Sequence, residues 1–282
     1  MQSEDAPDPE RPATPIPSAT VMLVRDGTTG VEVFLMERSA HGPFGGLHVF
    51  PGGKVDGADH AHRFASICEG PSDGSASESL GLSSGGLSYW VACIRECFEE
   101  AGILLARGSD GQSLRLQSPE MRRRYAEYRD QMNSGEAGRL EALCLDQNVR
   151  LAADQLAYVS HWITPVDQPK RFNTRFFVAR APAEQEALHD GHETVESLWI
   201  RPEAVLKGFS EGQFNLISPT LSNLESISGF ETTEALLEAK RQIDPASIPT
   251  ILPRLIPSES KAFDEILDVV GYGGQLDEGT PA

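Results

Sequence analysis

The most constraining feature of the chain is a crowded acidic run at residues 95–103 (Arg-Glu-Cys-Phe-Glu-Glu-Ala-Gly-Ile). In a helix, Glu96, Glu99 and Glu100 would lie at i, i+3 and i+4, so their carboxylates would project from one face. Like charges at this spacing repel one another, and hard carboxylate oxygens suit Mg²⁺ or Mn²⁺ better than zinc. A divalent cation would relieve this crowding. A solvated acidic face with a salt bridge from Arg95 explains the same run equally well.

An apolar stripe supports the helix. Four residues recur at helical spacing on a largely different face: Val91, Ile94, Phe98 and Ala101. They give the helix a side to bury, and Gly102 supplies its stop.

A second stretch at residues 50–59 (Phe-Pro-Gly-Gly-Lys-Val-Asp-Gly-Ala-Asp) decides between the two interpretations. Together with residues 95–103 it resembles the Nudix box, which reads Gly, five residues, Glu, seven residues, then Arg-Glu-apolar-any-Glu-Glu-any-Gly-apolar. Gly53 takes the first position of the pattern. Asp59 stands where the family usually has Glu, and 35 residues instead of seven separate it from Arg95, an insertion of 28.

The insertion is similar to one in a branch of the Nudix hydrolase superfamily related to the peroxisomal coenzyme A diphosphatases of animals. Three further stretches resemble the same branch, at residues 37–39, 46–53 and 171–177. The resemblance runs roughly from residue 20 to residue 206. It implies a Nudix α/β/α sandwich with a mixed β-sheet, plus a helical insertion and a C-terminal elaboration.

Composition narrows the ligand class. The net charge of −18 argues against nucleic acid as a partner, because neutralising phosphates requires clustered Lys and Arg, and it disfavours an RNA-decapping enzyme for the same reason. Small phosphorylated ligands remain compatible when a cation bridges them to the acidic protein. The four cysteines form no Cys-x-x-Cys pair and are interpreted as reduced thiols in a cytoplasmic protein.

The chain divides into a disordered acidic, Pro-rich tail at residues 1–18, a Nudix domain at 19–208 with the insertion at 60–88, a C-terminal elaboration at 209–272 and a flexible tail at 273–282. We expect no signal peptide and no membrane span. The C-terminal residues are not a peroxisomal Ser-Lys-Leu address. A homodimer is compatible with the sequence.

Local patterns predict the elements. Strands are expected at residues 20–24, 31–37, 48–50, 161–165, 175–179 and 197–200. Helices are expected at residues 119–133, 135–143, 202–207 and 232–242, and an extended segment at 249–257. The weak alternation of 31–37 suggests a strand covered on both faces. The Gly- and Ser-rich composition of 60–88 is typical of a flexible loop, serving either as a lid beside the site or as a disordered excursion.

Arginines on the expected helix at 119–133 carry much of the positive charge of the chain: Arg122, Arg123, Arg124 and Arg129. A solvated helix face explains them, and the alternative is an anion contact for the 3′-phosphate of a nucleotide.

The resemblance also assigns roles to residues. It implies metal ligands at Glu96, Glu99 and Glu100 and at the carbonyl of Gly53. It implies catalytic roles for Glu99 and for Glu193, which would position or deprotonate water, and a supporting role for Arg95, which would hold the glutamates through an ion pair. Glu196 is the alternative to Glu193. The substrate-binding candidates are Arg38, Phe50 and Arg175, the last because a charge in an apolar strand must find a partner or reach a cleft.

The implied reaction is metal-dependent hydrolysis of a nucleoside diphosphate linked to another moiety, a small-molecule substrate. The branch favours coenzyme A or acyl-coenzyme A, cut to 3′,5′-ADP and phosphopantetheine or its acyl ester, with Mg²⁺ or Mn²⁺ as cofactor. ADP-ribose or NADH remains an alternative substrate. A catalytically silent Nudix-like nucleotide-binding module is the alternative from another class of protein.

Overall fold

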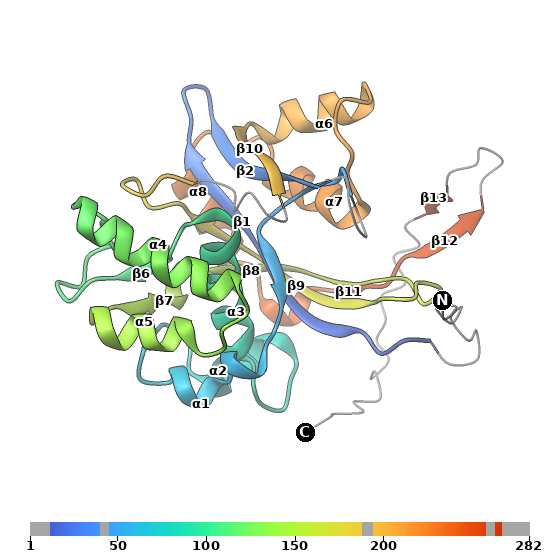
Figure 1. Ribbon diagram of the computed structural model, residues 1–282. Coiled ribbons are helices and arrows are strands. Elements are labelled where there is room, and N and C mark those ends of the chain that lie inside the picture. Colours follow the sequence, from blue (N-terminus) through green and yellow to red (C-terminus); the bar gives the residue numbers. More distant parts are fainter. Residues whose placement is uncertain (1–11, 40–44, 188–193, 258–262, 267–282) are drawn as a thin grey trace, which may run out of the picture.

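The computed structural model describes residues 12–39, 45–187, 194–257 and 263–266 (Figure 1). Its centre is a sheet with these strands: β1 (Ile16–Asp26), β2 (Val31–Arg38), β3 (His48–Val49), β4 (Gly52–Lys54), β8 (Ala157–Ile163), β9 (Phe172–Arg180), β10 (Thr194–Ile200) and β11 (Thr250–Ile251). Six of them lie in the order β10-β2-β1-β9-β8-β11, while β3 pairs with β2 and β4 with β1. The sheet is mixed, as predicted, because β1 runs parallel to β9 and antiparallel to β2.

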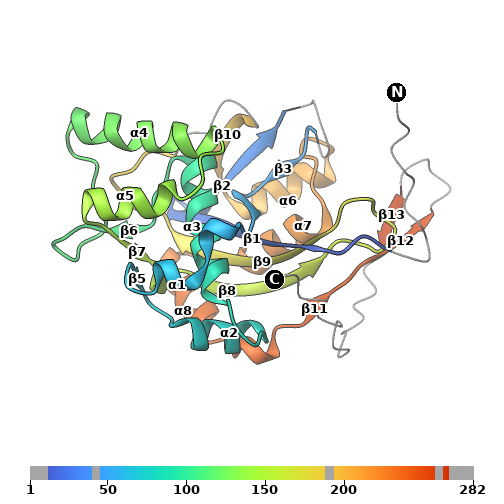
Figure 2. The ribbon, with the colours of Figure 1, turned by 60° about the horizontal axis from the view of Figure 1, so that its bottom comes forward.

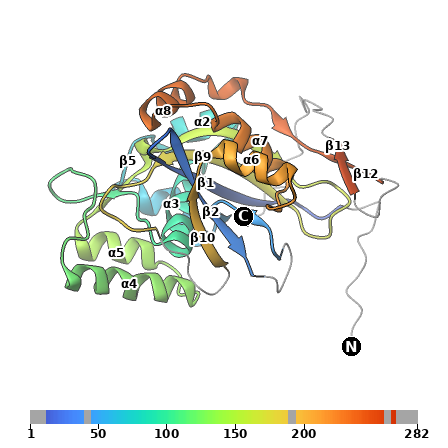
Figure 3. The same ribbon diagram turned by 90° about the horizontal axis from the view of Figure 1, so that it is seen from above.

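Helices cover both faces of the sheet (Figure 3). One face carries α3 (Leu87–Ala101), and the other carries α6 (Pro202–Ser210), α7 (Ser218–Ile227) and α8 (Thr233–Arg241). Strand β2 shows why two layers are needed. Phe34 and Met36 pack in the cluster on the α3 side, whereas Val33 and Leu35 pack in the cluster on the α6–α8 side. The prediction of a strand covered on both faces is confirmed.

Two further helices stack outside α3 (Figures 1 and 3), namely α4 (Pro119–Asn133) and α5 (Arg139–Gln147). The prediction for α4 is confirmed at both ends. Helix α5 begins four residues later than expected, because Gly135 and Gly138 take positive φ angles of 83° and 75° in the intervening turn. The ring of Tyr125 on α4 meets Phe98 on α3 edge-on, with centroids 6.5 Å apart.

The insertion at 60–88 is folded, so the flexible-loop prediction was wrong and the expected helical insertion is confirmed. It contains α1 (Ala61–Phe64), β5 (Cys68–Glu69) and α2 (Asp73–Leu80). Serine and glycine serve here as caps: Ser72 Oγ accepts from Ser75 N at the start of α2, and Gly81 ends it at φ 68°. Apolar anchors reach the main core, namely Phe64, Ile67, Ala76 and Leu80.

A small second sheet connects the insertion to the region after α3. It consists of β5, β7 (Arg150–Ala152) and β6 (Ala106–Arg107), in that order. The described residues also contain short 3₁₀ helices: η1 (Gly57–Asp59) after β4, η2 (Ala153–Gln155) after β7 and η3 (Pro245–Ser247) after α8.

Segments near both ends of the described chain join the main sheet. Strand β1 begins at Ile16, before the expected domain start at 19, and its first pairing is with Phe172 on β9. At the other end, α8 confirms the helix predicted at 232–242, and β11 joins the main sheet beside β8. Strands β12 (Arg254–Pro257) and β13 (Phe263–Ile266) form a separate hairpin away from the main sheet (Figure 2). The domain limits stay predictions. Across the described ranges, no helix combines the length and apolar character needed to span a membrane.

Candidate active site

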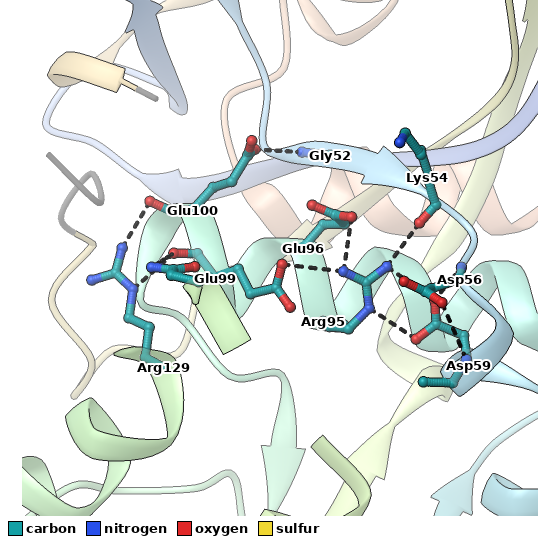
Figure 4. Close-up of polar contacts among 11 residues, drawn as sticks. Gly52, Lys54, Asp56, Asp59, Arg95, Glu96, Glu99, Glu100 and Arg129 are labelled. Atoms are coloured by element: carbon teal, nitrogen blue, oxygen red, sulfur yellow. Dashed lines mark hydrogen bonds and ion pairs between the residues drawn. The ribbon is translucent and has the colours of Figure 1, made fainter. Parts of the chain in front are cut away.

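The two stretches that form the Nudix-box pattern meet in space (Figure 4). Helix α3 buries its apolar stripe, with Phe98 the most exposed of the four predicted residues at 2%. The opposite side faces strand β4 and the loop that follows it. The helix ends at Gly102, whose φ of 70° is the left-handed conformation that glycine adopts without strain.

Two glycines of β4 approach the acidic side of α3 closely. Gly52 N donates to Glu100 Oε2 at 2.8 Å. A Cβ added at Gly53 would lie 2.5 Å from Glu96 Oε1, which is shorter than any real contact. The backbone of β4 therefore lies against the glutamates at a distance that only glycine permits.

Arg95 is the centre of the polar network. Its Nε and Nη2 donate to Asp59 Oδ1 and Oδ2, both at 2.9 Å. Its Nη1 donates to Glu96 Oε1 at 2.8 Å and to Glu99 Oε2 at 3.1 Å. Its Nη2 also donates to Lys54 O at 2.7 Å. One guanidinium thus links the loop after β4 to two carboxylates of α3.

Asp59 fills the position where the resemblance expects Glu. Its side chain is 1% exposed, and Oδ2 also accepts from Asp56 N at 2.8 Å. Asp59 ends the 3₁₀ helix η1, and from there its side chain, one methylene shorter than that of Glu, forms a bidentate ion pair with Arg95. In this structure Asp59 orients Arg95.

Burial sets the electrostatics of the site. The pKa of Glu96 is raised to about 7, chiefly by burial and also by the charges of Glu99 and Asp59, while Arg95 acts in the opposite direction. The pKa of Glu99 is likewise raised, chiefly by burial. Burial alone would lower the pKa of Arg95, but the hydrogen bonds and charges of Asp59 and its neighbours hold it above its usual value. The site is therefore a partly buried region with a surplus of carboxylate.

The donor set fits a hard divalent cation. Among the described residues no group of three or more His, Cys, Asp or Glu side chains is arranged as a ready metal cage. Instead Glu96 and Glu99 accept from Arg95, and Glu100 accepts from Gly52. Carboxylates whose pKa is raised by burial and mutual repulsion gain most from a nearby cation. Turning these side chains toward an ion would supply the oxygen ligands that Mg²⁺ and Mn²⁺ prefer.

A pocket of about 210 Å³ adjoins this network. Its lining includes Asp59, Arg95 and Glu99 together with residues 135–141, which form the turn between α4 and α5 and the start of α5. The pocket places open space next to Glu99.

The remaining predicted site residues lie in different surroundings. Glu193 lies outside the described residues. Glu196 is exposed and lies opposite Glu37 of β2 in the strand register, beside a bulge in β10. Arg38 is half-buried at the end of β2, and Phe50 is 4% exposed in the core cluster on the α6–α8 side. Of the described candidates, Glu196, Arg38 and Phe50 lie outside the hydrogen bonds that Arg95 makes.

Arg175 is buried beside the N-terminal half of α3, with 3% of its surface exposed. Its guanidinium carbon lies 4.9 Å from the centre of the Tyr89 ring, and its Nη1 donates to Asn173 Oδ1 at 2.6 Å. Its Nε is buried and has no hydrogen-bond partner among the described residues. Arg175 shares a sheet row with Ala19 and Gly53, so it lies two strands away from the site on the same face.

His161 continues this polar chain. An amide oxygen can only accept, so Asn173 Oδ1 accepts from both Arg175 Nη1 and His161 Nε2. The other ring nitrogen, His161 Nδ1, then accepts from Thr250 Oγ1 at 2.8 Å. The pKa of His161 is lowered to about 4, chiefly by burial and also by the charge of Arg175. The imidazole is therefore neutral at pH 7 with its proton on Nε2.

Sequence reasoning missed the role of Arg129. It donates from Nε to Glu99 O and from Nη2 to Glu100 O, each at 2.9 Å, and so binds the end of α3 (Figure 4). Arg122, Arg123 and Arg124 are exposed, and Arg122 donates to the carbonyls of Leu116 and Gln117, just before its own helix begins. Helical spacing distinguishes Arg129 from the other three arginines, because it places Arg129 beside the buried Tyr125, Tyr128 and Met132 on one face of α4.

Comparison with known proteins agrees with this geometry. The family model "NUDT19 Nudix domain" matches residues 74–227, just over half of the chain, including α3. A Nudix hydrolase structure from Alicyclobacillus acidocaldarius is similar in fold, with a TM-score of 0.65 and 23% identity, covering 80% of this chain and 96% of that one.

Curated relatives come from animals. Acyl-coenzyme A diphosphatase NUDT19 of Xenopus laevis is 22% identical, over 73% of this chain and 62% of that protein. Its namesake from Homo sapiens is 25% identical, over 73% of this chain and 63% of that protein. The matched region thus spans less than two thirds of the length of either relative. With the family model covering more than half of its residues and the box residues gathered around Arg95, the chain belongs to the NUDT19 Nudix-domain family of the Nudix hydrolases.

Proposed function

We propose that this chain is a metal-dependent diphosphatase that hydrolyses coenzyme A or acyl-coenzyme A to 3′,5′-ADP and phosphopantetheine or its acyl ester. The observation that carries the proposal is the array in which Arg95 binds Asp59, Glu96 and Glu99 against the glycines of β4. The names of the animal relatives support the substrate class.

In this proposal Glu96, Glu99 and Glu100 hold Mg²⁺ or Mn²⁺ together with the carbonyl of Gly53. The chemistry supplied by a bound cation is charge neutralisation on the diphosphate and activation of a water molecule. Arg95 keeps the carboxylates from dispersing, since one guanidinium binds two of them and is itself fixed by Asp59.

Glu193 is proposed to position or deprotonate the attacking water, with Glu196 as the alternative. The water oxygen bonds to one phosphorus, the bridging P–O bond breaks, and the proton taken from water is released to solvent after product formation. Arg38, Phe50 and Arg175 are the proposed substrate contacts. Phe50 and Arg175 are buried, so a direct contact from either requires the side chains above it to move.

A substrate panel tests the proposal. The chain is incubated with coenzyme A, acetyl-coenzyme A, ADP-ribose or NADH in Mg²⁺ or Mn²⁺, and products are identified by chromatography. We expect 3′,5′-ADP from the coenzyme A substrates, with kcat/KM at least about tenfold above that for ADP-ribose or NADH. A preference for ADP-ribose or NADH by the same margin would show that coenzyme A is not the preferred substrate. Binding of these nucleotides without any hydrolysis would instead identify a nucleotide-binding module.

A further inference from the structure

Arg129 is presented to the site by the packing of α4. Three residues of this helix are buried, Tyr125, Tyr128 and Met132, at the spacing of one helix face. Arg129 lies at the edge of that face and is half-buried. The contact between Tyr125 and Phe98 fixes α4 against α3, and Arg129 then reaches the last turn of α3.

The contacts of Arg129 are with the backbone of the two terminal glutamates. Nε donates to Glu99 O and Nη2 donates to Glu100 O, both at 2.9 Å. The guanidinium also lies over Gly102, where an added Cβ would be 3.0 Å from Nη1. The glycine that ends the helix therefore also makes room for the arginine.

The last turn of α3 is electrostatically unfavourable without such a partner. Carbonyl groups at a helix C-terminus lack intrahelical donors and carry the negative end of the helix dipole. In α3 this turn contains Glu99 and Glu100 and no basic residue. A cation must therefore come from another element, and α4 supplies it.

We propose that Arg129 is a positioning residue for the metal ligands: by holding the carbonyls of Glu99 and Glu100, it fixes the direction in which their side chains leave the helix. This inference rests on the proposed function, in which those carboxylates bind a divalent cation. It goes beyond that function by assigning a necessary contact to α4, an element outside the Nudix-box pattern.

Direct Mn²⁺ binding without substrate tests the inference, with free Mn²⁺ measured by electron paramagnetic resonance. Arg129→Met keeps most of the side-chain length and removes the donors. We expect its Mn²⁺ dissociation constant to rise at least about tenfold, as for other residues that support metal ligands. Arg124→Met, the same change at an exposed position of the same helix, serves as the control and is expected to bind Mn²⁺ within about twofold of wild type.

A second variant guards against loss of folding. Arg129→Lys retains one cation that can reach one carbonyl, so we expect Mn²⁺ affinity between those of wild type and Arg129→Met, with kcat for coenzyme A lowered more than KM is raised. If the methionine variant does not fold, the lysine variant decides alone. Wild-type Mn²⁺ affinity in a folded Arg129→Met or Arg129→Lys protein would overturn the inference. Failure of wild type itself to bind Mn²⁺ would overturn the metal site, and with it this inference.

Discussion

Asp59 and Arg95 form a buried two-point ion pair, with Nε to Oδ1 and Nη2 to Oδ2 both at 2.9 Å. The aspartate is 1% exposed and the arginine side chain 13%. This pair sets the guanidinium plane, and the same guanidinium binds Glu96 and Glu99 through Nη1. Asp59, at the end of η1, thus holds Arg95 from the position where the resemblance expects Glu.

Replacing Asp59 with Asn should destabilise the fold. The amide retains the size of the carboxylate but has only one oxygen, so its NH₂ group faces one of the two buried Arg95 donors and that hydrogen bond is lost, at a cost of about 3 kcal/mol in the free energy of unfolding. Urea denaturation of Asp59→Asn beside Asp56→Asn measures this. Asp56 is exposed, and Asn caps a helix as well as Asp does, so its variant should unfold like wild type. Equal midpoints for the two variants would contradict the importance of the pair.

Gly53→Ala should impair the site while sparing the fold. The new methyl group would meet the carboxylate of Glu96 at 2.5 Å, and the end of a flexible side chain can move aside at little cost in stability. We expect the unfolding free energy to stay within about 1 kcal/mol of wild type, and Mn²⁺ affinity to fall by at least about tenfold.

Gly57→Ala is the matched control for that experiment. Gly57 begins η1, four residues after Gly53, and the nearest atom to its added Cβ is His60 Nε2 at 3.9 Å, an ordinary contact. Isothermal titration calorimetry with Mn²⁺ should show weaker binding to Gly53→Ala than to Gly57→Ala. If the two bind alike, the close approach of β4 to Glu96 has no bearing on metal binding.

The box residues could be predicted from sequence because their spacing is a local property. One helical turn places Glu96, Glu99 and Glu100 on one side of α3, and the burial of Val91, Ile94, Phe98 and Ala101 follows from the same period. The two-sided burial of β2 was visible in its weak alternation for the same reason.

Tertiary contacts explain what the sequence could not predict. The composition of the insertion predicted a flexible loop. The structure instead holds α2 in place through Asp73, which accepts from the backbone N–H groups of Gly85 and Leu87, each more than ten residues away in sequence. Arg129 could not be distinguished from its exposed neighbours because its hydrogen-bond acceptors lie on another helix, α3. The polar chain from Thr250 to Arg175 depends on β11 lying beside β8, a pairing of segments far apart in sequence.

Stability should fall with acid through His161. Its pKa is lowered to about 4 in the fold against about 6.5 when unfolded, so below pH 6.5 the unfolded chain binds a proton that the native chain does not. This residue alone should cost about 2 kcal/mol between pH 7 and pH 5, and the loss levels off below pH 4.

Unfolding free energies of wild type and His161→Gln across this pH range measure the effect. Gln can still donate to Asn173 but cannot titrate, so the variant should lose less stability than wild type on acidification. His62→Gln, the same change at an exposed histidine, should follow the wild-type slope. Parallel curves for wild type and His161→Gln would show that the imidazole is not held neutral by burial beside Arg175.

The most direct test of the central claim is the rate at which 3′,5′-ADP is released from coenzyme A in Mg²⁺, compared among wild type, Glu99→Gln, Glu100→Gln and the exposed control Glu120→Gln. Thermal unfolding checks that each variant is folded. We expect a loss of at least about a hundredfold in the first two variants and wild-type activity in the control, because an amide oxygen is a much poorer ligand for a hard cation than a carboxylate. Folded Glu99→Gln and Glu100→Gln proteins that release 3′,5′-ADP at the wild-type rate would contradict it.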